Sequence, residues 1–144
     1  MYSRIVIALD ESPQAKRALT TAIELAKKLG AELRLLTVSE PLPVYAALID
    51  SEIPGGRQML LEERNTFYRN LQNEAIRDAA AAGLVVQAKI VEGNEVQSIV
   101  DHIAETGADL LVIGRRHHAS IGNMLGRTVH SVAEKARCSI LAVY

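Results

Sequence analysis

The chain has 144 residues, of which 49% are hydrophobic and 3% aromatic, with 16 Lys and Arg against 17 Asp and Glu. This length predicts one domain spanning residues 1–144, with a core of aliphatic side chains. A net charge of −1 excludes a general electrostatic attraction to nucleic acid or anionic lipid. The scarcity of aromatic rings also argues against a stacking surface for single-stranded nucleic acid.

The apolar runs of the sequence are short. The run at residues 110–113 is far shorter than the ~20 residues that a membrane span needs. The amino-terminal run ends in Asp10, whereas a secretory signal needs a longer apolar region and a cleavage site. The single cysteine, Cys138, excludes an internal disulfide framework. We therefore expect a cytoplasmic protein with no membrane insertion and no nucleic-acid partner.

The first forty residues predict a strand, a helix and a second strand. Residues 5–9 are a continuous apolar run, typical of a strand covered on both faces. Ser12 is a good helix N-cap and Pro13 suits the first helical turn. Apolar residues then recur at a spacing of three to four until Gly30, which favours the end of a helix. A second strand follows at residues 33–38.

Residues 39–58 interrupt this alternation. They contain three of the four prolines and two adjacent glycines, so we expect a long excursion with one helical turn at about residues 45–49. A loop of this length in a compact domain is usually functional or mobile. A helix is then expected from about residue 59 to residue 82. Its inward face should consist of Phe67, Leu71, Ala75 and Ala79.

The second half of the chain alternates in the same way. Residues 84–91 alternate polar and apolar side chains, which indicates an edge strand with one wet face. Asn94 opens a helix with apolar residues at helical spacing. Residues 108–113 are continuously apolar and predict a central strand. After a loop from residue 114 to about 125 come a fourth helix and a last strand at residues 139–143.

This order predicts an α/β fold. Five parallel strands joined by right-handed crossovers form an open, doubly wound, Rossmann-like sheet with helices on both faces. We expect the strand order 3-2-1-4-5, which reverses between strands one and four. Such sheets bind ligands beyond the carboxyl ends of the strands at this reversal. The expected site therefore lies between Asp10 and the loop that begins at Gly114.

Five residues at this edge suggest chemistry, and each has a structural alternative. Asp10 is either an acceptor for the hydroxyls or ring edge of a nucleoside, or a carboxylate favoured by a helix dipole. Gly114 allows a ligand close to the main chain, although a strand exit also favours glycine. Gly126 precedes the fourth helix, whose free N–H groups form an anion site. Arg127 and Thr128 add a guanidinium and a hydroxyl group.

The loop itself carries a basic cluster of Arg115, Arg116, His117 and His118. These side chains either clamp phosphate or form a solvated loop. We expect no metal held by protein ligands, because Cys-x-x-Cys and His-Glu-x-x-His motifs are absent from the sequence. His102 and His130 are expected on the surface or at the edge of the core. The sequence also lacks the P-loop, the dinucleotide glycine motif and the hydrolase Gly-x-Ser-x-Gly motif.

Several segments together resemble the universal stress protein family. Residues 5–12 resemble the first-strand signature of that family, in which hydrophobic residues are followed by Asp, a variable residue and Ser. Residues 35–38 and 109–114 resemble its second and fourth strands, and residues 132–135 and 138–143 its closing helix and strand. The resemblance covers all five strands. It implies a fold of the adenine nucleotide alpha hydrolase type.

The nucleotide-binding branch of that family has a loop of Gly, two residues, Gly, nine residues, Gly, then Ser or Thr. Gly114 and Gly126 match the outer glycines. His117 replaces the middle glycine, the second spacer has eight residues, and Arg127 stands where Ser or Thr is expected. Family members with shorter loops and a non-glycine middle position resemble this chain, so the resemblance still implies ATP or AMP as the ligand. Mg²⁺ would arrive with the phosphates of ATP.

The resemblance assigns roles to residues at the edge of the sheet. Ala8 and Leu9 would line the base pocket, Asp10 would meet the ribose or the adenine, and Val38 would meet the adenine through its main chain. Ribose and phosphates would contact Gly114, Gly126, Arg127 and Thr128. The other candidate binding residues are Ile113, Arg116 and His117.

The sequence leaves three functions open. The first is a nucleotide-binding module that presents a change in residues 39–58 to an unknown protein partner in a stress response. The second is a dimeric interaction protein without nucleotide, and the third is a slow ATP hydrolase or nucleotidyl-transfer enzyme. A homodimer is expected in each case, because an apolar last strand at a sheet edge invites pairing. That strand contains Ile140, Leu141, Ala142 and Val143, and the alternative is a monomer in which Tyr144 shields the edge.

Overall fold

The protein, seen in a computed structural model, is described here for residues 1–115 and 127–144. In chain order the elements are β1 (Arg4–Ala8), α1 (Pro13–Leu29), β2 (Glu32–Ser39), the 3-10 helix η1 (Val44–Leu48), α2 (Ile49–Glu52), α3 (Gly56–Ala81), β3 (Gln87–Glu92), α4 (Glu95–Thr106), β4 (Leu110–Gly114), α5 (Arg127–Lys135) and β5 (Ser139–Val143). The strands form one parallel sheet in the order β3-β2-β1-β4-β5. This confirms the predicted fold class and strand order. Within the described ranges, no helix is long and apolar enough to cross a membrane.

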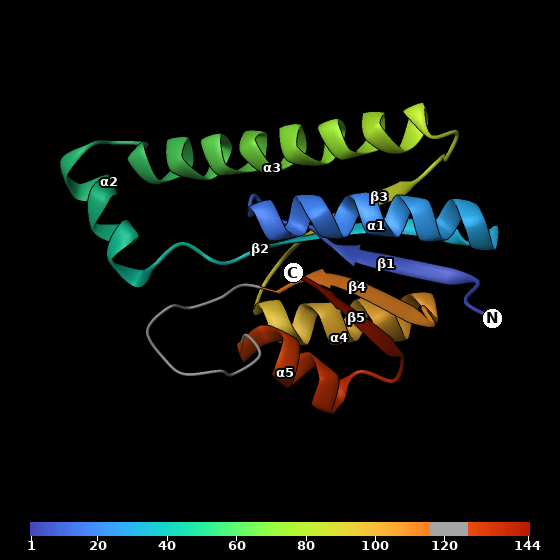
Figure 1. The fold of residues 1–144 in the computed structure, drawn as a ribbon. Coiled ribbons are helices and arrows are strands. Elements are labelled where there is room, and N and C mark those ends of the chain that lie inside the picture. Colours follow the sequence, from blue (N-terminus) through green and yellow to red (C-terminus); the bar gives the residue numbers. More distant parts are fainter. Residues whose placement is uncertain (116–126) are drawn as a thin grey trace.

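The sheet lies between two layers of helices. Figure 1 shows α1 and α3 on one face and α4 and α5 on the other. Alternate residues of β1 supply both cores: Ile5 and Ile7 pack in the cluster with α1 and α3, and Val6 packs in the cluster with α4 and α5. A continuous apolar run is therefore needed in the central strands, because both of their faces are buried.

The helices that follow β1 and β3 begin and end where the sequence predicts. The Ser12 hydroxyl accepts a hydrogen bond from the Ala15 amide at 3.1 Å, and Gly30 closes α1 with a φ of +62°. The Asn94 side chain accepts from the Gln97 amide at 3.0 Å and caps α4. Both helices thus start at the carboxyl end of the sheet, where a side-chain oxygen replaces a missing helical acceptor.

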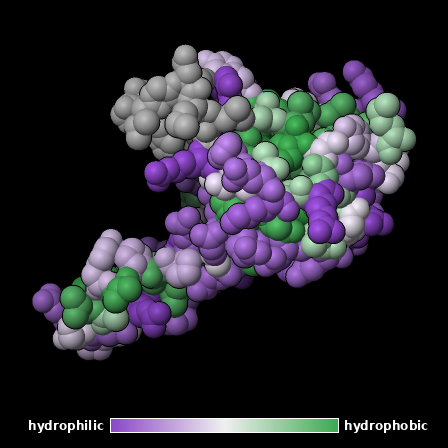
Figure 2. All heavy atoms as spheres, turned by 90° about the horizontal axis from the view of Figure 1, so that it is seen from below, coloured by the Kyte–Doolittle hydropathy of each residue, from purple (hydrophilic) through white to green (hydrophobic). Residues whose placement is uncertain are grey.

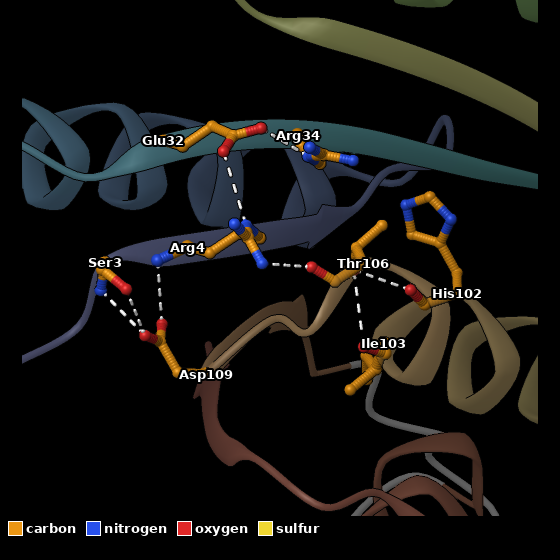
Figure 3. Close-up of polar contacts among 8 residues, drawn as sticks. All are labelled: Ser3, Arg4, Glu32, Arg34, His102, Ile103, Thr106 and Asp109. Carbon is orange, nitrogen blue, oxygen red and sulfur yellow. Dashed lines mark hydrogen bonds and ion pairs between the residues drawn. The ribbon is translucent and has the colours of Figure 1, made fainter.

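Asp109 ties β1 to β4 at the opposite, amino end of the sheet. Its carboxylate accepts from the Ser3 amide at 2.9 Å, the Ser3 hydroxyl at 2.8 Å and the Arg4 amide at 3.0 Å (Figure 3). Burial opposes ionisation, but these hydrogen bonds outweigh it and hold the pKa of Asp109 below its usual value. The contacts fix the register of the two central strands, whose far ends build the site described below.

Residues 39–58 contain the predicted helical turn, which is η1, followed by α2. These two helices and the first half of α3 form a helical arm that stands away from the sheet (Figures 1 and 2). The arm exposes large apolar side chains, with Val44 93% and Tyr45 68% accessible. α3 begins at Gly56, three residues before the expected start at about residue 59.

The predicted inward face of α3 is buried only in the second half of the helix. Ala75 and Ala79 are buried and Leu71 packs against the core, but Phe67 is 50% exposed. The prediction for Phe67 was therefore wrong. Helical spacing identifies a stripe of residues, whereas burial also needs a sheet beneath it, and α3 extends beyond the sheet edge (Figure 1).

β3 is an edge strand, as predicted, but it begins at Gln87 instead of residue 84. The Leu84 amide donates to the carbonyl of Ala79 at 2.9 Å and so completes the end of α3. The first residue of β3 to pair is Gln87, opposite Arg34 of β2. The apolar residues before it belong to the helix-to-strand turn, and Val85 is 99% exposed.

Candidate functional site

A cavity of about 300 Å³ opens at the carboxyl ends of β1 and β4. These neighbours lie at the point where the strand order reverses, which is the usual ligand position in an open α/β sheet. The cavity is lined by Ala8, Leu9, Asp10, Ser12, Ala15, Leu36, Val38, Glu95, Ile99, Ile113, Gly114, Arg127, Thr128 and Val129. Its wall thus combines apolar side chains from three strands with the first residues of three helices.

Most of the sequence-predicted binding residues meet at this cavity. The described ones are Ala8, Leu9, Asp10, Val38, Ile113, Gly114, Arg127 and Thr128, and every one of them lines it. Arg116, His117 and Gly126 lie outside the described residues, as does His118. Arg115 is described but is not part of the lining; its amide donates to the Val143 carbonyl at 2.7 Å, and its guanidinium lies 5.4 Å from the centre of the Tyr144 ring.

Asp10 is held in a turn that directs the chain from β1 into α1. One carboxylate oxygen accepts from the Ser12 amide at 2.8 Å, and the Ser12 hydroxyl in turn caps α1. Asp10 makes further contacts, and it is half-buried in the cavity wall. A short side chain fixed by its own turn can present an acceptor to a ligand in a defined orientation.

Gly114 is required for a different reason from the one its position suggests. A Cβ atom at this residue would lie 2.6 Å from the Gln14 carbonyl carbon, 2.7 Å from the Ala15 amide nitrogen and 2.9 Å from the Gln14 oxygen. The group that approaches the main chain of β4 is therefore the first turn of α1. Gly114 shapes the cavity by allowing this helix to start against the strand end.

Sequence reasoning missed six lining residues, which are Ser12, Ala15, Leu36, Glu95, Ile99 and Val129. Of these, Glu95 matters most chemically. It is the first residue of α4, and its carboxylate accepts from the Thr128 hydroxyl of α5 at 3.3 Å. A signal was present: in a parallel α/β fold each helix that follows a strand starts at the same sheet edge, so the residue after the Asn94 cap faces that edge.

The charged lining residues of the described part are two carboxylates, Asp10 and Glu95, and one guanidinium, Arg127. Arg127 and Thr128 are the first described residues of α5, and the amides at the amino end of a helix generally lack helical acceptors. The positive end of that helix therefore adds to the charge of Arg127 and favours an anion. Among the described residues, no three His, Cys, Asp or Glu side chains cluster in a way that could hold a metal ion.

Two other titratable groups lie away from the cavity. His102 is 6% exposed, so the expectation of a surface or core-edge position is wrong, and its ring nitrogens have no hydrogen-bond partner in the described part of the chain. Burial, helped by Lys89 and Arg34, holds the pKa of His102 below its usual value. Cys138 is half-buried just before β5, and burial raises the pKa of its thiol, which fits an unreactive side chain.

The chain is similar to proteins of one known family. The model of the "Universal stress protein family" matches residues 1–144. The chain is 27% identical over 147 residues to universal stress protein YxiE of Bacillus subtilis, with 99% of each chain covered. It superposes on the universal stress protein UspA from Lactobacillus plantarum with a TM-score of 0.84 and 21% identity, covering 99% of this chain and 98% of that one.

A further solved structure is that of a universal stress protein in complex with cAMP. The chain matches it with 28% identity and a TM-score of 0.71, covering 99% of this chain and 97% of that one. The family model matches the whole chain. This match agrees with the order of the strands in the sheet and with the resemblance of the strand and helix segments to that family. The chain therefore belongs to the universal stress protein family.

Proposed function

We propose that this protein binds an adenine nucleotide, AMP or ATP, in the cavity at the carboxyl ends of β1 and β4. It would act as a single cytoplasmic domain, 1–144, that regulates a stress response or binds a partner in a nucleotide-dependent way. The observation that carries this proposal is the convergence of residues from β1, β2, β4 and α5 on one 300 Å³ cavity at the strand-order reversal. A related universal stress protein was solved with cAMP, which favours an adenine ligand.

The base would lie on the apolar part of the wall. Ala8, Val38 and Ile113 all line the cavity; Val38 would meet the adenine through its main chain, and Ala8 and Ile113 would provide apolar contact. Adenine is flat and partly apolar, and small-molecule sites usually combine an apolar wall with a few fixed polar groups. Asp10 would accept a hydrogen bond from a ribose hydroxyl, because an ionised carboxylate is an acceptor only.

The phosphate would lie at the start of α5. The amino end of this helix and the guanidinium of Arg127 favour an anion there, and Gly126, Arg116 and His117 belong to the same proposed site. Mg²⁺ would come with the phosphates of ATP, since it keeps several waters and needs only one or two protein ligands. We propose no catalytic residue, and hydrolysis would at most be slow.

A homodimer through β5 is the second part of the proposal. Within the described residues, β5 pairs with β4 alone and is the last strand of the sheet. Ile140, Leu141, Ala142 and Val143 make this edge apolar, and Leu141 is 36% exposed. An apolar sheet edge is an energetic liability unless another strand or chain covers it, and a second copy would bring the same edge in two-fold symmetry.

A thermal-shift experiment tests the nucleotide site. Ligand at 100 times its Kd should stabilise the wild type by about 2.7 kcal/mol, which is roughly 5–11 °C in Tm for a chain of this size. Asp10→Asn and Arg127→Met should each reduce the shift. Arg137→Met removes an exposed guanidinium outside this cavity and should leave the shift unchanged. If millimolar AMP and ATP both leave the wild-type Tm unchanged, the proposal is wrong.

A further inference from the structure

The helical arm carries most of the exposed apolar side chains of the described chain. Seven of the twelve large hydrophobic residues that are exposed in residues 1–115 and 127–144 lie between Val44 and Phe67. Single exposed apolar residues are normal on a protein surface, whereas a cluster of them marks an interaction surface. Figure 2 shows hydrophobic side chains gathered on the arm, away from the sheet. The composition of the arm is therefore that of a docking surface.

The arm has a fixed internal structure. A Cβ atom at Gly56 would lie 2.6 Å from the Ile49 side chain and 3.3 Å from that of Ile53, so α2 packs directly against the first turn of α3. The Asp50 carboxylate accepts a hydrogen bond from the Arg57 amide at 3.0 Å and joins the same two helices. Because these contacts hold the arm together before any partner arrives, less conformational entropy is lost on binding.

The face of α3 that α2 contacts at Gly56 continues along the arm. The next positions on this face, at a spacing of three or four residues, are exposed, and they are Met59, Leu60, Glu63 and Phe67. We call these four residues the arm face. The contact at Gly56 shows that this side of α3 accepts a helix. Since α2 has only four residues, the later turns remain open to another helix.

The arm face is acidic as well as apolar. A shallow depression on this part of α3 is lined by Met59, Glu62, Glu63 and Thr66. Within the described residues neither Glu62 nor Glu63 forms an ion pair, and Glu62 accepts only from the neutral Gln58 amide group at 3.2 Å. Residues 40–67 contain five carboxylates and two guanidinium groups, a net charge of −3, whereas the whole chain carries −1.

This charge pattern decides between two kinds of occupant. A second copy of the chain in a two-fold arrangement would bring the same surface to the contact, and with it a second Glu62 and Glu63. Like charges brought together at an interface suppress that pairing. A helix with apolar side chains on one face and Lys or Arg beside them would instead satisfy both the apolar groups and the carboxylates.

We propose that the arm face docks a basic amphipathic helix of another protein. Met59, Leu60 and Phe67 would receive apolar side chains of the partner spaced at i, i+3 or i+4, and i+7, and Glu62 and Glu63 would pair with its Lys or Arg. The inference rests on the partner-binding part of the proposed function and does not depend on the nucleotide site. Since few side chains take part, the contact belongs to the small, transient class, with a micromolar Kd.

Fluorescence anisotropy of labelled peptides on the full-length, nucleotide-free protein tests the inference. The probe is a peptide of about 18 residues, long enough to form a helix, with Leu on one helical face and Lys on the other. A second peptide has Glu in place of Lys, and a third has the Leu and Lys positions scrambled. The wild type should bind the Leu-Lys helix at least tenfold more tightly than either comparison peptide.

Two variants with matched controls locate the binding. Phe67→Ser removes an apolar contact and should weaken binding of the Leu-Lys helix about tenfold. Val85→Ser changes an exposed apolar residue after the other end of α3 and should leave the Kd unchanged. Glu63→Lys should weaken the Leu-Lys helix and strengthen the Leu-Glu peptide, each about fivefold. Glu74→Lys makes the same change of net charge at an exposed position of the same helix and should have a much smaller effect.

Three results would overturn the inference while the nucleotide site stands. They are a Leu-Lys helix bound no more tightly than the comparison peptides, an unchanged Kd in Phe67→Ser, and an effect of Glu63→Lys no larger than that of Glu74→Lys. A molar mass that falls from wild type to Phe67→Ser in light scattering would assign the arm face to a second copy instead. Phe67→Ser should keep the wild-type thermal shift with AMP, so a failed nucleotide site is recognised separately.

Discussion

Replacement of Gly114 by alanine should be among the most damaging small changes in this protein. The new Cβ would lie 2.6 and 2.7 Å from the Gln14 carbonyl carbon and the Ala15 nitrogen, against an ordinary separation of about 3.5–4.0 Å. These are backbone atoms, so no side chain can rotate away, and α1 must shift from β4 by several tenths of an ångström. That shift would disturb the packing of Ala15 and Ala18, which are almost fully buried. Overpacking of this kind costs about 1–3 kcal/mol, occasionally more, and we expect about 3 kcal/mol here.

Gly30→Ala is the matched control for this prediction. Gly30 has a φ of +62° and open space around its missing side chain, so alanine there costs only left-handed backbone strain, about 1 kcal/mol. Urea unfolding followed by circular dichroism measures both variants, and both share the smaller entropy of the unfolded alanine chain. With about 2–4 °C of Tm per kcal/mol, Gly114→Ala should melt roughly 6–12 °C below the wild type. A Gly114→Ala loss no larger than that of Gly30→Ala would refute the packing argument.

Three further outcomes follow from other contacts. His102 has a folded-state pKa below its usual value, so the unfolded chain binds the proton first and the free energy of unfolding falls as pH drops below about 6.5. Between pH 7.5 and 5.5 the His102→Leu variant should therefore lose less free energy of unfolding than the wild type. Equal losses would contradict this. Asp109→Ala removes the acceptor for the Ser3 and Arg4 amides and should lower the free energy of unfolding, measured with urea, by roughly 2 kcal/mol. An unchanged stability would show that the register of β1 and β4 does not depend on Asp109. Leu141→Lys places a charge on the edge strand β5 and should convert the proposed dimer to a monomer, as measured by light scattering. A wild type that is already monomeric would refute the proposed dimer.

The sheet was predictable because its signals are local and redundant. The central strands β1 and β4 are continuous apolar runs, and the helices between strands are marked by Ser12, Asn94 and glycines at their ends. Right-handed crossovers then leave few possible topologies. The location of the candidate site followed from topology too, since the reversal of strand order places Asp10 and Gly114 at one edge.

The errors concern properties that depend on distant packing. The inward positions in the second half of α3 were predicted correctly, since Ala75 and Ala79 are buried, but Phe67 is 50% exposed. His102 is buried, although a polar side chain on a helix gives no signal in the sequence that it will be. The role of Gly114 depends on how closely α1 starts against β4. The contact between Glu95 and Thr128 joins residues that are 33 positions apart in the sequence. None of these distances is encoded in a window of neighbouring residues.

The nucleotide content of the purified protein tests the central proposal most directly. The protein is purified natively without added nucleotide and denatured, and the released small molecules are separated by ion-pair chromatography beside a Gly126→Asp variant that places a carboxylate at the proposed phosphate position. A bound adenine nucleotide released from the wild type, and absent from the variant, is the expected result. Nucleotide-free protein that also fails to take up AMP or ATP at millimolar concentration would contradict the account.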